Sequence, residues 1–193
     1  VQTCALPILD LLVEVDGEKI NIELSNRMSK GIKERNVVYA CEVHGKQLHY
    51  QDNDYSEISR TLQICLNNFK CNNNKLVDTY YLKNEDGEIL SEKFQIDYVD
   101  LEIAKEKRYN DNKLARFCRA LNCLTMDDFK KEIGGIMEKE AENKLIEEVD
   151  KYSKDDEVIA LYSAYSKEEL ERNTYIKEAK EFGYAEGRAK GIA

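Results

Sequence analysis

Alternation of apolar and polar residues predicts a β-hairpin near the start of the chain. Leucine and valine occupy every second position over residues 9–15, and isoleucine and leucine do so over residues 20–24. Asp16-Gly17 lies between the two segments, and Asp-Gly at such a point favours a two-residue hairpin loop. We therefore expect a hairpin with one polar face and one apolar face that can pack against a helix.

The period of two recurs to about residue 105 and then changes to the helical period of 3.6. We expect a helix over about 29–44 and further strands over 60–67, 76–82 and 94–101. Helices are expected near 111–122, 126–133, 136–152 and from 167 to the end, with Thr125 and Ser166 in capping-box sequences. The fold class is thus α/β, followed by a helical C-terminal part.

Composition narrows the class of protein. Of the 193 residues 42% are hydrophobic and 35% are charged, which is typical of a soluble globular protein. No run of about 18 apolar residues occurs, so no membrane-spanning helix and no membrane partner is expected. The cysteines form no C-x-x-C pair and only two histidines occur, which excludes a tetrahedral zinc set and indicates thiols of a reducing cytoplasm.

Two acids of the hairpin are candidate metal ligands. If Asp16 and Gly17 form the loop, opposed residues have numbers that add to 33, and Asp10 lies directly opposite Glu23. Like charges so placed destabilise a hairpin unless a cation neutralises them. Two carboxylates on adjacent strands suit Mg²⁺, which can activate water for attack on a phosphodiester. The competing interpretations are a solvated acidic face, or a register shifted by one residue that breaks the pairing.

The run from Leu9 to Leu24, followed by Gly31-Ile-Lys-Glu-Arg-Asn-Val-Val-Tyr-Ala40, resembles the PD-(D/E)XK nuclease-family transposases, also called recombination-promoting nucleases. The likeness extends through residues 55–69, Tyr80-Tyr81-Leu82 and the glycine-spaced tail. It implies a restriction-endonuclease-like core, in which a mixed β-sheet is flanked by helices. It also implies cleavage of DNA that depends on Mg²⁺ or Mn²⁺.

The resemblance assigns the site by position. Asp10 is the first metal-binding acid and Glu23 is the second. The third motif residue, a lysine or in this family often glutamine or asparagine, falls on Ser25, whose hydroxyl cannot carry a charge. We therefore expect Asp10, Glu23 and Ser25 at the catalytic site, with Asn26 as an alternative source of the polar group.

The segment after Glu23 has a local charge of +3 over residues 27–35. Its basic residues are candidates for contacts to DNA phosphates: Arg27, Lys30, Lys33 and Arg35. The last three are also alternative sources of the missing cation, while the competing interpretation is a solvated helix face. The net charge of −9 argues against DNA only if the surface is uniform, and this local cluster shows that it is not.

Three functions are compatible with this sequence. The first is a Mg²⁺-dependent DNA endonuclease of the recombination-promoting or transposase-like type. The second is a catalytically degraded nuclease fold that acts as a DNA-binding or self-associating module, with a homo-oligomer formed through the C-terminal helices. Ser25 favours the second function and the two acids favour the first. The third, a helical scaffold without nucleic acid, has only the acidic composition in its support.

The ends of the chain lead to a separate expectation. Residues 1–8 read as one translated frame of a common sequencing adapter, and we leave them out of the fold. The expected domains are a nuclease-like core over 9–105, whose first helix and strand would lie upstream, and a helical region over 106–193. In that region Gly183, Gly187 and Gly191 form a glycine-spaced tail that favours a solvated helix or weak self-association.

Overall fold

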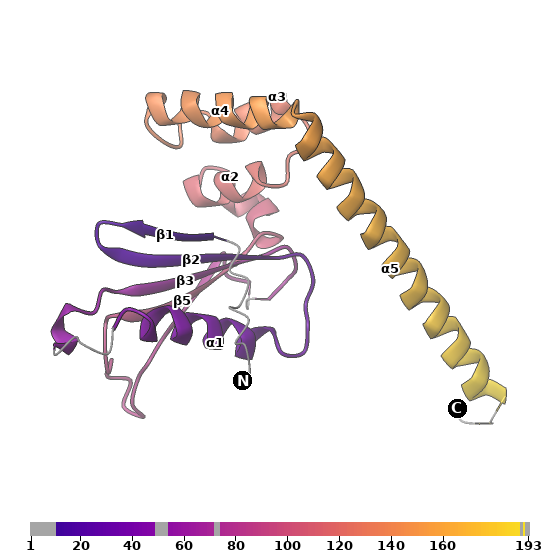
Figure 1. The fold of residues 1–193 in the computed structure, drawn as a ribbon, viewed down its shortest axis with the longest axis horizontal. Helices are drawn as coiled ribbons and strands as arrows, with labels where there is room; N and C mark the ends of the chain where they lie inside the picture. Colours follow the sequence, from indigo (N-terminus) through magenta and orange to yellow (C-terminus); the bar gives the residue numbers. More distant parts are fainter. Residues whose placement is uncertain (1–10, 49–53, 72–73, 190, 192–193) are drawn as a thin grey trace. The chain divides into compact units, whose positions relative to one another are not determined.

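A single mixed sheet of five strands organises the first part of the chain (Figure 1). The computed structural model describes residues 11–48, 54–71, 74–189 and 191. The strand order is β1-β2-β3-β5-β4, in which β2, β3 and β5 run parallel and the two edge strands run antiparallel to their neighbours. The strands are β1 (Leu11–Val15), β2 (Glu18–Ser25), β3 (Thr61–Asn67), β4 (Val77–Tyr81) and β5 (Phe94–Asp100). The expected α/β class with a mixed sheet is confirmed.

The first hairpin forms in the expected register. Asp16 and Gly17 both have positive φ, 51° and 80°, as a two-residue turn with this handedness requires. Val15 pairs with Glu18 and Leu11 pairs with Ile22, so every described pair has residue numbers that add to 33. The local turn chemistry therefore fixes the register of β1 on β2.

Helix α1 (Ile32–Gly45) connects β2 to β3 and lies along one face of the sheet (Figure 1). Its Ala40 is fully buried against side chains of β3 and β5, namely Cys65, Phe94, Ile96 and Tyr98. The helix begins at Ile32 rather than near residue 29, and Gly31 occupies its N-cap.

The polar face of the hairpin, rather than its apolar face, is the one covered by α1. Asn21, Glu23 and Ser25 are buried on β2, whereas Leu24 between them is 49% exposed. Helix α1 is therefore not a helix that packs against the apolar face of this hairpin. Alternation in a strand shows that its two faces differ, but the direction of the β2-α1-β3 crossover decides which face a helix covers.

The main apolar cluster lies on the opposite face, around β5 and the segments that follow it. Val99 and Leu101 are buried there with Leu76, and Ala115 and Cys118 of α2 (Lys113–Ala120) complete the cluster. Short 3-10 turns join these elements: η2 (Ile103–Lys105) and η3 (Lys107–Tyr109), with η1 (Tyr55–Glu57) before β3. The sheet is therefore packed on both faces near β3 and β5.

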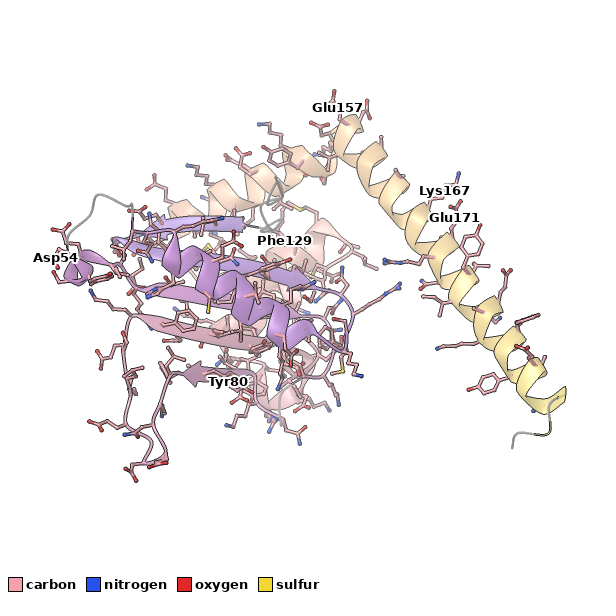
Figure 2. All side chains as sticks on the ribbon, turned by 60° about the horizontal axis from the view of Figure 1, so that its bottom comes forward. Asp54, Tyr80, Phe129, Glu157, Lys167 and Glu171 are labelled. Carbon is pink, nitrogen blue, oxygen red and sulfur yellow. The ribbon has the colours of Figure 1, made fainter. Side chains whose placement is uncertain are left out.

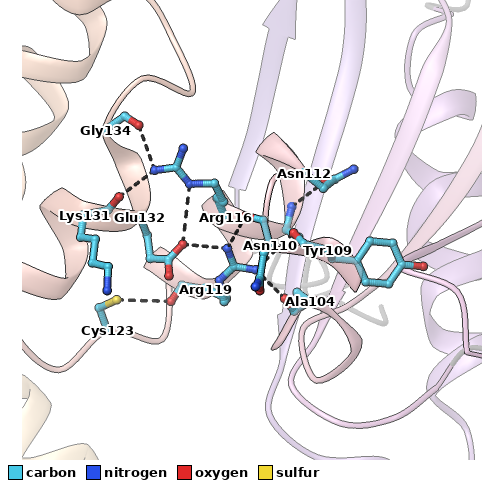
Figure 3. Close-up of polar contacts among 11 residues, drawn as sticks. Ala104, Tyr109, Asn110, Asn112, Arg116, Arg119, Cys123, Lys131, Glu132 and Gly134 are labelled. Carbon is cyan, nitrogen blue, oxygen red and sulfur yellow. Dashed lines mark hydrogen bonds and ion pairs between the residues drawn. The ribbon is translucent and has the colours of Figure 1, made fainter. Parts of the chain in front are cut away.

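Helix α3 (Met126–Ile133) is held to α2 by arginine contacts (Figure 3). Arg119 forms an ion pair of 2.9 Å with Glu132 and donates to the carbonyl oxygen of Ala104 at 2.8 Å. Thr125 Oγ1 accepts the backbone N–H of Asp128 at 3.1 Å, which confirms the expected N-cap. Both helices and the sheet belong to one compact unit, and this unit ends at Ile136.

The second compact unit runs from Met137 and contains α4 (Lys139–Ser153) and α5 (Asp156–Ala189). Helix α5 begins eleven residues earlier than expected, so Ser166 lies inside the helix and does not cap it. Asp155 provides the cap instead, because its Oδ1 accepts the backbone N–H groups of Glu157 and Val158. Among the helices of the described chain, none is both long and apolar enough to cross a membrane.

Candidate functional site

A row of buried polar side chains on β2 is the most unusual feature of the sheet. Glu23 is 3% exposed, Asn21 is fully buried, and Ser25 is also buried, all on the face that α1 covers. Burying a carboxylate is costly unless other groups solvate it. Natural sequences tolerate such local costs mainly where a function requires them.

The Asn21 amide contacts the Glu23 carboxylate and links it to Gln63. Asn21 Nδ2 donates to Glu23 Oε1 at 3.3 Å and to Gln63 Oε1 at 2.7 Å. Gln63 lies on β3 opposite Asn21, and Cys65 lies on β3 opposite Glu23. Gln63 Nε2 in turn approaches Cys65 Sγ at 3.8 Å. The carboxylate therefore belongs to a polar network that crosses from β2 to β3.

The Cys65 thiol next to Glu23 is not a nucleophile at neutral pH. The pKa of Cys65 is raised to about 12, mainly by burial. The hydrogen bond from Gln63 and the charge of Arg35 lower this pKa, and the charge of Glu23 raises it. With this raised pKa the thiol stays protonated beside the carboxylate. Only the thiolate attacks or binds metal well, so Cys65 does neither.

Arg35 brings a positive charge to Ser25. Its Nη2 donates to Ser25 Oγ at 3.0 Å, and its guanidinium carbon lies 5.8 Å from the ring centroid of Tyr39, one turn further along α1. The hydroxyl and the ring together restrict the guanidinium at the C-terminal end of β2. A charge from the helix thus occupies the end of the strand where Ser25 provides none.

The other basic residues of the segment lie elsewhere. Tyr80 lies on the edge strand β4 (Figure 2). Lys33 Nζ lies 5.7 Å from the centroid of its ring. Two strands, β3 and β5, separate β4 from β2 in the sheet. Arg27 and Lys30 are exposed in the loop before α1, as is Asn26. The basic residues of the segment are therefore spread from the loop after β2 to the edge strand β4, and Arg35 donates to Ser25.

Asp10, the first acid of the predicted pair, lies outside the described residues, which begin at Leu11. Within the described part of the chain no group of three or more histidine, cysteine or acidic side chains could hold a metal ion. Asn21 Oδ1 is nevertheless buried beside Glu23 without a hydrogen-bond partner. Carboxylate and amide oxygens are the donors that Mg²⁺ and Mn²⁺ prefer, so the chemistry of these side chains fits such an ion.

Sequence reasoning missed Gln63 and Cys65 as neighbours of Glu23. The available signal was the alternation along β3, where apolar residues interleave with Thr61, Gln63, Cys65 and Asn67. A polar face is normally interpreted as solvated, yet all four of these side chains are buried.

A family model described as PD-(D/E)XK nuclease family transposase matches residues 3–179. The match includes all five strands, α1 to α4 and most of α5, and therefore both compact units. A search of curated proteins and a search of solved structures each gave no match.

Proposed function

The chain belongs to the PD-(D/E)XK nuclease family transposases, and on that premise we propose that it is an endonuclease that hydrolyses DNA phosphodiesters with a divalent metal ion. The observation that supports this proposal is Glu23, a carboxylate that is 3% exposed in the polar row beneath α1. Burying this acid while the neighbouring Leu24 stays half exposed is costly, and such a cost supports a functional role for Glu23.

Asp10 and Glu23 are the residues that would hold the ion, Mg²⁺ or Mn²⁺. The register of the described residues, in which Leu11 pairs with Ile22, is the one that the predicted pairing of Asp10 with Glu23 requires. Opposed carboxylates about 5 Å apart repel each other without a cation and can share one. When bound, such an ion activates water and stabilises the negative charge that develops on the phosphate.

Arg35 would provide the charge that the family motif places on a lysine. The motif named in the family description ends in lysine two residues after the second acid, and that position here is Ser25. Arginine binds phosphate through parallel N–H donors, and the guanidinium that Ser25 Oγ holds would bind a phosphate oxygen next to the Glu23 site. Ser25 then orients this guanidinium as its hydrogen-bond acceptor.

The remaining basic residues would position DNA outside the reacting bond. Arg27 and Lys30 precede α1 next to the end of β2, and Lys33 lies further away against Tyr80. Contacts of this kind neutralise backbone phosphates without reading the base sequence. DNA is therefore the proposed partner. These contacts would not select the base sequence at which it is cut.

Nicking of supercoiled plasmid by the full chain tests this proposal. We expect Mg²⁺- or Mn²⁺-dependent nicking, and we expect Glu23→Gln to lower its rate at least about 100-fold because the charge that holds the ion is lost. Glu14→Gln is the matched control, since Glu14 lies on the same hairpin but is exposed and ion-paired to Lys19. Equal rates for the original chain and both variants would exclude the site.

A second candidate function is supported by Ser25. A serine in place of lysine is compatible with a degraded nuclease that retains DNA binding or associates through its C-terminal helices. In that case the full chain binds duplex DNA without nicking it, and Ser25→Lys restores nicking. If the Ser25→Lys variant binds DNA but does not nick it, the missing lysine alone does not explain the loss of nicking.

A further inference from the structure

Two buried amide side chains connect Glu23 to the neighbouring strand. Asn21 and Gln63 are both fully buried and face each other across β2 and β3. One N–H group of Asn21 donates to Gln63 at 2.7 Å and the amide also donates to Glu23 at 3.3 Å. We call Asn21 and Gln63 the amide bridge.

The chemistry of its neighbours determines how the amide bridge is oriented. An ionised carboxylate only accepts hydrogen bonds, so Asn21 must present Nδ2 to Glu23. Gln63 must then present Oε1 to Asn21. In this orientation the Nε2 of Gln63 points toward Cys65 Sγ, at 3.8 Å. Each amide therefore has one orientation that agrees with the polar groups around it.

The amide bridge is a costly way to fill the sheet. A buried amide without full hydrogen bonding destabilises the fold, and Asn21 Oδ1 has no partner within the described chain. The other face of the same two strands instead carries isoleucine and leucine at every position between the polar residues. An apolar pair at positions 21 and 63 would pack without this cost, so packing alone does not account for the amides.

We propose that Asn21 and Gln63 are positioning residues that hold the Glu23 carboxylate in the orientation in which it binds the metal ion. This inference rests on the proposed function, in which Glu23 is a ligand. Asn21 restricts rotation of the carboxylate, and Gln63 fixes Asn21 from the neighbouring strand. Binding then loses less conformational entropy, which is the usual effect of groups that support a metal ligand.

Titration of the full chain with Mn²⁺, followed by the electron paramagnetic resonance signal of free Mn²⁺, measures this effect without cleavage. We expect Asn21→Leu and Gln63→Leu each to weaken Mn²⁺ binding about 10-fold or more. The double variant should be no weaker than Asn21→Leu alone, because Gln63 acts through Asn21. A purely structural pair would lower the melting temperature and leave the Mn²⁺ affinity of the folded protein unchanged.

Asn36→Leu is the matched control for loss of a buried amide. Asn36 is also fully buried and has an unpartnered Oδ1, but it lies on α1 and donates to the Tyr98 hydroxyl. Its variant should bind Mn²⁺ as the original chain does. Equal weakening by Asn36→Leu would attribute the effect to general loosening and overturn the inference.

An exchange of the two amides keeps the test valid if a leucine variant does not fold. Asn21→Gln combined with Gln63→Asn moves one methylene from one strand to the other and preserves the total length of the amide bridge. We expect this double variant to bind Mn²⁺ more tightly than Gln63→Asn alone, in which the two amides no longer meet. Binding equal to that of Gln63→Asn, with both proteins folded, would overturn the inference.

Glu23→Gln separates failure of this inference from failure of the proposed function. If Glu23→Gln abolishes Mn²⁺ binding but Asn21→Leu and Gln63→Leu do not weaken it, the positioning role is wrong and the metal site stands. If Glu23→Gln leaves Mn²⁺ binding unchanged, the proposed function itself is wrong and the positioning role is lost with it.

Discussion

At the scale of single residues, the end of β2 combines side chains from two elements. Glu23 and Ser25 come from the strand, and Arg35 reaches Ser25 from the helix that follows. Guanidinium groups stay charged under all ordinary conditions, so Arg35 would stabilise phosphate charge without transferring a proton. The proposed division of labour therefore assigns binding of the ion to the strand and charge stabilisation to the helix.

Removing the positive charge of Arg35 and then placing a lysine on β2 tests the role of Arg35. We expect Arg35→Gln to lower plasmid nicking about 100-fold, since a charged donor at the reacting phosphate is lost. Adding Ser25→Lys to Arg35→Gln should recover much of that activity by returning a cation to β2. Lys33→Gln is the control, because Lys33 contacts Tyr80 on β4, and it should weaken DNA binding only slightly. Equal losses for both helix variants would contradict a specific role for Arg35.

The cysteines should differ in reactivity according to burial. Burial raises the pKa of Cys65 to about 12 and that of Cys118 to about 11, whereas Cys41 is exposed on α1. Because thiolate is the reactive form, iodoacetamide at pH 8 should modify Cys41 readily and leave Cys65 and Cys118 intact in the folded chain. Mass spectrometry of the modified peptides measures this difference, and it should disappear in denaturant. Rapid modification of Cys65 without denaturant would contradict its position beneath α1.

At the scale of elements, the first hairpin depends on one backbone conformation. Gly17 has a φ of +80°, and no atom lies within 4 Å of a Cβ added there. Any cost of substitution therefore comes from the backbone conformation and not from a clash. Because β2 carries Glu23, the same turn sets the register of the candidate site.

Substitution of two glycines by alanine should have opposite effects on stability. We expect Gly17→Ala to lower the free energy of unfolding by about 1 kcal/mol, since alanine rarely adopts this φ. Gly45→Ala, at the end of α1 and also in open space, should raise it by up to about 1 kcal/mol because alanine favours the helix. Urea titration gives both values. A stabilised Gly17→Ala variant would mean that the turn differs from the one described.

At the scale of the whole molecule, the two compact units differ in how they bury side chains. Most residues of β3 and β5 are buried, whereas every described side chain of α5 is exposed. A helix without tertiary packing has little stability of its own in water. The second unit is therefore expected to open independently of the sheet.

Amide hydrogen exchange distinguishes these parts. We expect the amides of β3 and β5 to exchange through global unfolding and those of α5 to exchange at least about 100-fold faster. Slow exchange in α5 that accelerates on dilution would indicate self-association through the C-terminal helices, as the second candidate function proposes. Slow exchange in α5 at every concentration would contradict its exposure in the monomer.

The sequence by itself determined the local features. The Asp16-Gly17 turn and the alternation around it predicted the register of β1 on β2, because loop chemistry and strand period act between near neighbours. Thr125 marked the start of α3 for the same reason. The start of α5 was missed because the sequence from Ser166 satisfies a capping pattern that can also occur inside a helix.

The surroundings of Glu23 were decided only by tertiary structure. The alternation along β2 could not show which face α1 covers, since that depends on how the chain crosses from one parallel strand to the next. Nor could this pattern predict the contact between Gln63 and Asn21, because residues 42 positions apart meet only when β2 and β3 pair. The sequence thus identified Glu23 and Ser25 as candidates, while the assembled sheet and helix decided their burial, their amide neighbours and the approach of Arg35.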